Sequence, residues 1–160
     1  MATGIKTIEA DGNNRDCRIA IVASQFNAYI VDRLLQGCLS TLNAAGIENS
    51  SITLVKVPGA FEIPVAAKKL ATESKVSAII TLGAIVRGET PHFDLIAQAC
   101  TNGIAQIALD TGLPVVFGVL TVDNVQQAMD RSGDEESNKG SESAKVALEM
   151  ISVLGKIGQE

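Results

Sequence analysis

The chain has 160 residues, of which 46% are hydrophobic and 19% charged, and this composition excludes a disordered protein and fits one globular domain. Only 3% of the residues are aromatic, the net charge is −5 and the pI is near 4.9, so nucleic acid is disfavoured as a partner. No apolar stretch approaches the ~20 residues that span a bilayer, and the N-terminus lacks a signal-peptide core, so we expect no membrane partner and a cytoplasmic location.

Residues 1–16 precede the regular pattern and form an N-terminal arm. Ile5, Thr7 and Ile8 predict a short strand in this arm. Such an arm is either frayed or paired with the sheet edge of a neighbouring subunit, and the prediction favours pairing. Residues 17–160 are expected to form a single domain.

Strands and helices alternate through the rest of the chain. Compact apolar runs predict four buried strands, at residues 17–24, 52–57, 77–86 and 114–120. Apolar residues at helical spacing predict helices at residues 31–46, 63–73, 91–109, 124–131 and 141–155. This alternation implies right-handed crossovers and a four-stranded parallel sheet with helices on both faces. The expected fold class is therefore α/β, a three-layer flavodoxin-like sandwich.

The three cysteines lack a pattern that points to chemistry. Cys17, Cys38 and Cys100 are odd in number and do not have the spacing of metal ligands. We expect buried free thiols and no metal site.

The loops after the first two strands carry candidate ligand contacts. Phe26 falls in a polar turn after the first strand, where a ring either packs or stacks on a flat ligand. After the second strand, Gly59 lets the backbone approach a ligand, and Glu62 stands in an apolar stretch. Glu62 is either a solvated acid at a helix start or a carboxylate that accepts hydrogen bonds from a substrate.

The loop after the third strand carries His92, which is the only histidine of the chain. Thr90 fits a helix N-cap and Pro91 the first helical position, which places His92 in the first turn. Amides at a helix start bind phosphate, although the charge of Glu89 opposes an anion there. If the protein transfers protons through an imidazole, His92 supplies it.

The sequence in and after the fourth strand does not decide between structural and ligand-binding roles for its residues. Phe117 lies within an apolar strand, which favours the core. Arg131 ends the short helix and Lys139 follows an acidic run, and both are either ordinary surface residues or contacts to an anion.

Taken together, five collinear segments resemble the 6,7-dimethyl-8-ribityllumazine synthase family. They are SQFN, VPGAFEIP, LGAIVRGETPHFD, PVVFGVLTVDN and RSGDEESNKG. The resemblance implies that 5-amino-6-(D-ribitylamino)uracil condenses with 3,4-dihydroxy-2-butanone 4-phosphate, without a cofactor or metal. The products are the lumazine, phosphate and water, in the penultimate step of riboflavin biosynthesis.

The resemblance also assigns roles to individual residues. It implies that His92 transfers protons, that Phe26 stacks on the pyrimidine, and that Ala60, Phe61 and Glu62 hold the ribityl chain. It implies that the backbone of Ala84, Ile85 and Val86 reads the pyrimidine edge. It implies that Glu89, Thr90 and Arg131 bind the phosphate group, and that a neighbouring subunit supplies Phe117 and Lys139.

The resemblance further implies a homopentamer with sites between neighbours. In some members twelve pentamers form an icosahedral 60-subunit shell. A riboflavin synthase is a further candidate partner. The acidic run Asp134-Glu135-Glu136 departs from the usual Lys-Ala-Gly-rich loop near a subunit contact. Two alternatives remain: a non-catalytic flavin- or nucleotide-binding module and a shell-forming scaffold.

Overall fold

The computed structural model describes residues 4–14 and 16–159, and within them four strands form one sheet. The strand order is β2-β1-β3-β4, and each neighbouring pair is parallel. The register places Ile19 beside both Ile52 and Ala78. The strands are β1 (Ile19–Ser24), β2 (Ile52–Val57), β3 (Ala78–Val86) and β4 (Val115–Val122). The predicted parallel α/β sheet is confirmed.

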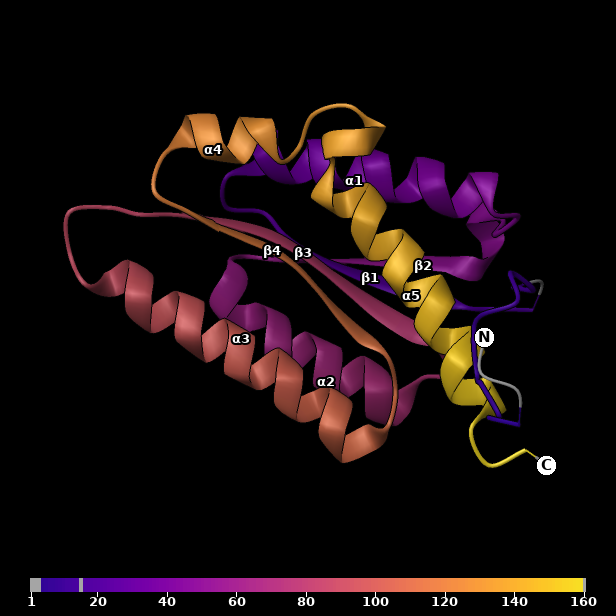
Figure 1. The fold of residues 1–160 in the computed structure, drawn as a ribbon. Coiled ribbons are helices and arrows are strands. Elements are labelled where there is room, and N and C mark those ends of the chain that lie inside the picture. The colour runs from indigo at the N-terminus through magenta and orange to yellow at the C-terminus, as the bar shows by residue number, and fades with distance from the viewer. Residues whose placement is uncertain (1–3, 15, 160) are drawn as a thin grey trace.

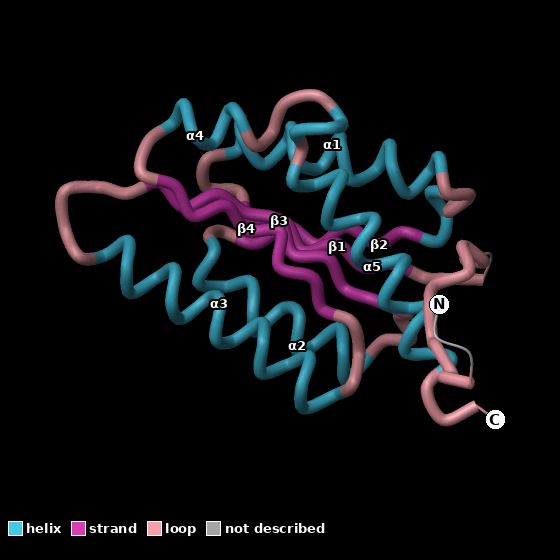
Figure 2. The backbone as a smooth tube through the Cα atoms, viewed as in Figure 1, coloured by secondary structure: helices cyan, strands magenta, loops and turns pink. Residues whose placement is uncertain are grey.

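Helices cover both faces of the sheet and make three layers (Figures 1 and 2). Helices α1, α4 and α5 lie on one face, and α2 and α3 lie on the other. In the described part of the chain the α-helices are α1 (Ala28–Ala44), α2 (Ile63–Glu73), α3 (His92–Thr111), α4 (Val125–Asp130) and α5 (Lys139–Lys156).

Alternation along the central strands divides the core into two apolar layers. Ile21 of β1 packs with Leu34 in the layer beneath α1 and α5, whereas Val22 packs with Ile63 in the layer above α2 and α3. Each such fully buried side chain contributes ~1.5–3 kcal/mol. Every residue of β1 is buried, as expected for a central parallel strand, while the edge strand β2 is largely exposed. The two core layers hold the strand ends in place beneath the loops that carry the candidate site.

The N-terminal arm, over residues 4–14, lies against α5 of the same chain. Lys156 Nζ donates to the Glu9 carbonyl at 2.6 Å and pairs with Asp11 at 3.3 Å, and Asp11 N donates to Ser152 Oγ at 3.1 Å. Residues 5–8 form no strand within this chain, because a strand needs a partner edge and the arm pairs with neither edge strand of the sheet, β2 or β4. Residues 1–3 and 15 of the arm lie outside the described residues, and pairing with a neighbouring subunit stays a prediction.

Capping side chains decide where the last two helices begin. Asn124 Oδ1 accepts from Gln127 N at 2.9 Å and so caps α4. Asn138 Oδ1 accepts from the amides of Gly140 and Ser141 at 2.8 and 3.1 Å. Helix α5 therefore begins at Lys139 rather than Ser141, and Lys139 lies in a helical turn rather than in a loop.

The three cysteines are free and buried, as predicted. Burial raises the pKa of the Cys38 thiol to about 12 and that of Cys100 to about 11. Both thiols stay protonated at neutral pH, which suits core residues and disfavours a nucleophilic role.

Candidate functional site

The loops after β1, β2 and β3 meet at the carboxyl ends of the strands. Strands β2 and β3 flank β1 on opposite sides. The chain runs from β1 to β2 on one side and then crosses to β3 on the other, so the strand order reverses between β1 and β3. Such a switch point opens a crevice outside the strand ends. Phe26 N donates to Pro58 O at 2.9 Å, and Asn27 Nδ2 donates to Ala84 O at 2.8 Å. These two bonds fix the first loop against the other two.

A cavity of about 570 Å³ opens at this switch point, a size suited to a small organic ligand. We call it the switch-point cavity. The predicted site residues that line it are Phe26, Ala60, Phe61, Glu62, Ala84, Ile85, Val86, Thr90 and His92. Pro58, Gly59, Gly88, Phe93 and Ile96 complete the lining. The structure thus brings together nearly all of the candidates on the first three loops.

The first loop presents an aromatic ring to this cavity. Phe26 is 72% exposed and Phe61 is 60% exposed, so neither ring is a core residue. The packing alternative for Phe26 is therefore excluded within the chain, and the ring is free to stack on a planar ligand.

Asn27 is a site residue that sequence reasoning missed. Its backbone is left-handed, with φ 59° and ψ 43°, a conformation in which asparagine is enriched among non-glycine residues. Its side-chain amide occupies the carbonyl of Ala84 in β3. The signal was an asparagine directly after a strand, but sequence spacing does not reveal the bond to β3.

Glu62 closes the turn that precedes α2. Its Oε2 accepts from Gly59 N at 3.0 Å, and the side chain is half-buried. This arrangement differs from a freely solvated acid, because the carboxylate satisfies an amide at a helix start. A carboxylate has several acceptor sites, so Glu62 still offers lone pairs to a hydroxyl or amine in the cavity.

His92 is exposed at the first residue of α3, on the rim of the cavity. The predicted cap is wrong by one residue: Pro91 precedes the helix, and its carbonyl accepts from Asp94 N at 3.1 Å. Pro91 itself has a helical φ of −64°. Thr90 Oγ1 instead accepts from His92 N at 3.4 Å, a long bond within the turn.

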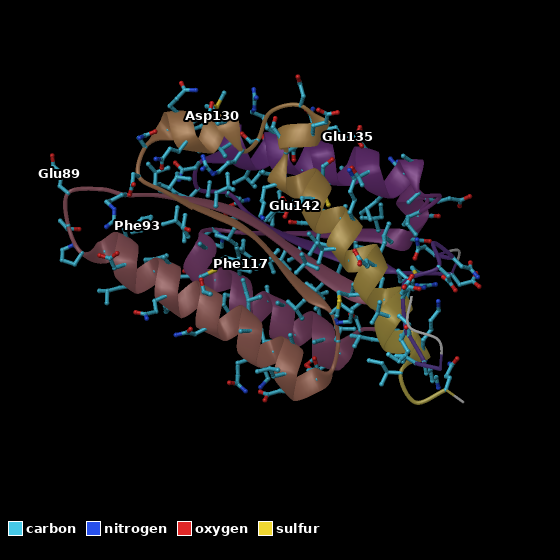
Figure 3. All side chains as sticks on the ribbon, viewed as in Figure 1. Glu89, Phe93, Phe117, Asp130, Glu135 and Glu142 are labelled. Carbon is cyan, nitrogen blue, oxygen red and sulfur yellow. The ribbon has the colours of Figure 1, made fainter. Side chains whose placement is uncertain are left out.

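Glu89 lies away from the cavity. Figure 3 shows it at the tip of the loop between β3 and α3, pointing away from the sheet, and it is absent from the cavity lining. The expected conflict between its charge and an anion is therefore reduced. A contribution of Glu89 to phosphate binding is confined to its backbone.

Arg87 is a second residue that sequence reasoning left without a role. Its Nε donates to Asp123 Oδ1 at 3.0 Å, its Nη1 donates to Asp94 Oδ1 at 3.3 Å, and its guanidinium lies 4.3 Å from the centroid of the Phe93 ring. The hydrogen bond to Asp123 is the main reason that the pKa of Arg87 is raised above its usual value. This residue joins β3, α3 and the loop after β4.

Phe117, Arg131 and Lys139 lie together in a different place. They line a second cavity of about 460 Å³ beside β4, which shares no lining residue with the switch-point cavity. Phe117 is 36% exposed, so the expectation of a core residue is wrong, because the edge position of β4 leaves its ring open. Figure 3 shows Phe117 and Glu142 well separated from Glu89.

A backbone hydrogen bond joins the two ends of the loop that runs from Arg131 to Lys139. Lys139 N donates to Arg131 O at 2.8 Å, which joins the backbones of these two residues. Lys139 Nζ pairs with Glu142 at 2.9 Å, and Glu136 lines the same cavity. The second cavity therefore combines an aromatic ring and two cations with two carboxylates.

Over residues 4–14 and 16–159, no group of three His, Cys, Asp or Glu side chains has an arrangement that could hold a metal ion. No helix in the same residues is long and apolar enough to cross a membrane.

A family model described as 6,7-dimethyl-8-ribityllumazine synthase matches residues 16–155. The match covers all four strands, ends within the last turn of α5 and includes every residue of both cavities. It agrees with the parallel sheet and with the five sequence segments that suggested this family. The chain therefore belongs to the 6,7-dimethyl-8-ribityllumazine synthase family, whose members are transferase enzymes of riboflavin biosynthesis.

Proposed function

We propose that this chain condenses 5-amino-6-(D-ribitylamino)uracil with 3,4-dihydroxy-2-butanone 4-phosphate to give 6,7-dimethyl-8-ribityllumazine, phosphate and water. The observation that carries the proposal is the switch-point cavity, which gathers the exposed ring of Phe26, the carboxylate of Glu62 and the imidazole of His92. A flat heterocycle fits against the ring, and the carboxylate accepts hydrogen bonds from ribityl hydroxyls. Ala60 and Phe61 line the path of the ribityl chain, and Ala84, Ile85 and Val86 face the pyrimidine edge.

The chemistry asks for proton transfer and orientation rather than a covalent nucleophile. An amine attacks the ketone, and the carbinolamine loses water to give an imine. Elimination of phosphate then leaves an enol that becomes a carbonyl, and the second amine closes the ring on this carbonyl with loss of a second water. Each of these steps moves a proton, and His92 stands at the rim where an imidazole can accept and return it. Thr90 and the backbone of Glu89 form the turn before α3, where exposed amides favour a phosphate group.

The remaining contacts come from a neighbouring subunit in this proposal. Arg131 pairs with the phosphate, and Phe117 and Lys139 complete the pyrimidine side. These three residues gather in the second cavity of the same chain, so a neighbour that places its second cavity against the switch-point cavity would assemble one complete site. This arrangement gives the cations of one chain to the switch-point cavity of another.

Members of this family act on small molecules and assemble as oligomers. Large apolar side chains outside both cavities support assembly of this chain, since Leu109 is 81%, Val65 69% and Leu95 67% exposed. We propose a homopentamer, with a 60-subunit shell as its higher assembly. Association with a riboflavin synthase and a cytoplasmic location stay predictions, and a cofactor is not part of the proposal.

The two alternatives make different predictions. A non-catalytic flavin- or nucleotide-binding module would bind flavin tightly and form no lumazine. A scaffold would form shells and bind neither substrate. The convergence of Phe26, Glu62 and His92 on one cavity favours the enzyme, because a scaffold has no need for this set.

Mixing the protein with both substrates tests the proposal, because the lumazine product is fluorescent. We expect turnover by the unmodified protein and a loss of about a hundredfold in Arg131→Ala, the size of a lost charge-assisted bond to phosphate. The loss should fall mainly on the phosphate-bearing substrate. Lumazine formation no faster than in the protein-free mixture would refute the proposal.

His92→Ala should keep a substantial residual rate, with a loss of about tenfold to a hundredfold in kcat. The substrates react readily once they are held together, so positioning supplies most of the acceleration and proton transfer the rest. Rapid-mixing kinetics with both substrates at saturation measures this loss. A variant that folds and binds both substrates but has no turnover would contradict this weighting.

A further inference from the structure

Gly88–Pro91, the turn before His92, has few bonds of its own to the fold. In the described part of the chain, its hydrogen bonds run within the turn or to the first turn of α3, and none reaches another element. A side chain at Gly88 would meet nothing within 4 Å. The position of Thr90 and His92 must therefore be set from the two ends of the turn.

Arg87 makes contacts at both ends of this turn. Its backbone N donates to Val122 O at 2.9 Å and so belongs to the β3–β4 pairing. Its guanidinium lies over the Phe93 ring at 4.3 Å and donates to Asp94 at 3.3 Å, both in the first turn of α3. One side chain thus joins the end of β3 to the start of α3 across the turn.

Phe93 connects the guanidinium of Arg87 to the switch-point cavity. Its side chain is 8% exposed and lines the switch-point cavity directly after His92 in the chain. Figure 3 shows it at the start of α3, beneath the sheet. Because the guanidinium lies against this buried ring, we expect a change at Arg87 to alter the direction in which α3 begins and, with it, the place of the imidazole.

Asp123 holds the guanidinium from the other side. It belongs to the loop between β4 and α4, and its carboxylate accepts from Arg87 Nε at 3.0 Å. Two carboxylates and a ring thus fix a planar fork that a lysine could not replace. With both carboxylates engaged, the geometry places the charge of Arg87 on protein groups rather than toward a ligand.

We propose that Arg87 is a positioning residue, which with Asp123 holds the turn Gly88–Pro91 so that Thr90 and His92 meet the substrate. This proposal rests on the proposed function, in which that turn receives the phosphate group. The side chains of Arg87, Asp94 and Asp123 are 45%, 62% and 66% exposed, and ion pairs this exposed contribute little to the stability of a fold. Loss of the network should therefore be seen in the site before it is seen in the melting temperature.

Kinetics of three variants test the role. In Arg87→Ala we expect KM for the phosphate-bearing ketone to rise about tenfold and kcat to fall about tenfold, with a much smaller change in KM for the pyrimidine. Asp123→Ala should act in the same direction, and Arg87→Lys should fail to restore the rate. Lys69→Ala, which removes an exposed ion pair with Glu73 away from the site, is the control and should be unchanged.

The Asp123 variant separates positioning from direct contact. If Arg87 bound the phosphate itself, removing Asp123 would release the guanidinium and lower KM for the ketone. A lower KM in Asp123→Ala, or unchanged kinetics in Arg87→Ala, would overturn the proposal.

A second readout does not depend on turnover. His92 is the only histidine, so an untagged protein labelled with ¹³C-histidine gives one set of imidazole resonances. We expect these resonances to shift in Arg87→Ala and Asp123→Ala but not in Lys69→Ala. Unchanged resonances in Arg87→Ala would overturn the proposal even if the unmodified protein made no lumazine, whereas missing lumazine alone would overturn the proposed function.

Discussion

Gly140→Ala should lower the free energy of unfolding by about 3 kcal/mol or more, the upper range for overpacking a core contact. A Cβ at Gly140 would overlap the carbonyl oxygen of Leu34 and lie 2.6 Å from its carbonyl carbon. Both atoms belong to the backbone of α1, so no side-chain rotation relieves the clash. Helices α1 and α5 would have to separate.

Separation would also break buried hydrogen bonds between the two helices. Ser141 Oγ lies 2.5 Å from Thr41 Oγ1 and donates to Gly37 O at 3.1 Å, and Asn138 Nδ2 donates to Arg33 O at 3.1 Å. Unpaired buried groups of this kind cost ~1–3 kcal/mol each. The start of α5 carries Lys139 as well, so the second cavity would be disturbed together with the fold.

Urea unfolding of Gly140→Ala measures the effect, and Gly155→Ala is the matched control on the same helix. Gly155 is exposed and a Cβ there would meet nothing within 4 Å, so alanine should be neutral or stabilise by up to about 1 kcal/mol. Equal unfolding midpoints for the two variants would show that α1 and α5 are not in close backbone contact.

Much of the fold follows from local signals. The four strands and the order of the helices could be read from apolar spacing, because central parallel strands such as β1 are buried throughout and give continuous apolar runs. The start of α5 was misplaced because the side chain of Asn138 decides it, and the start of α3 differs from the prediction by one residue. A strand in the arm at residues 4–14 depends on a partner edge that its own sequence does not contain, so its pairing with a neighbouring subunit stays a prediction.

The sequence predicted those site residues that can be recognised within a single loop, but not those whose role is a bond to a distant part of the chain. Phe26, Glu62 and His92 follow separate strands, and the rule that ligands bind at strand ends brought them together. Asn27 and Arg87 escaped notice because their roles are bonds to Ala84 and Asp123, which lie far away in the sequence. The spacing of residues also could not show that Arg131 would lie in a separate cavity.

That separation leads to the second large effect, which is recovery of activity in mixed oligomers. Chains that carry Phe26→Ala with His92→Ala lack the ring and imidazole of the switch-point cavity, and chains that carry Arg131→Ala lack the cation of the second cavity. If each site lies between neighbours, a chain of one kind can supply what the adjacent chain of the other kind lacks. Co-refolding equal amounts should restore about a quarter of the wild-type sites, although both parents are nearly inactive.

The control mixes Arg131→Ala with Phe117→Ala, which damage the same cavity. Every second cavity in such oligomers is defective, so activity should stay near the mean of the two parents. Lumazine fluorescence gives the rate, and light scattering on the same samples shows that the chains have assembled. If the first mixture also gave only the mean of its parents, each site would lie within one chain; a monomeric particle would likewise contradict a shared site. Recovery in the first mixture alone requires the two cavities to meet across subunits, because only that contact joins an intact imidazole to an intact Arg131.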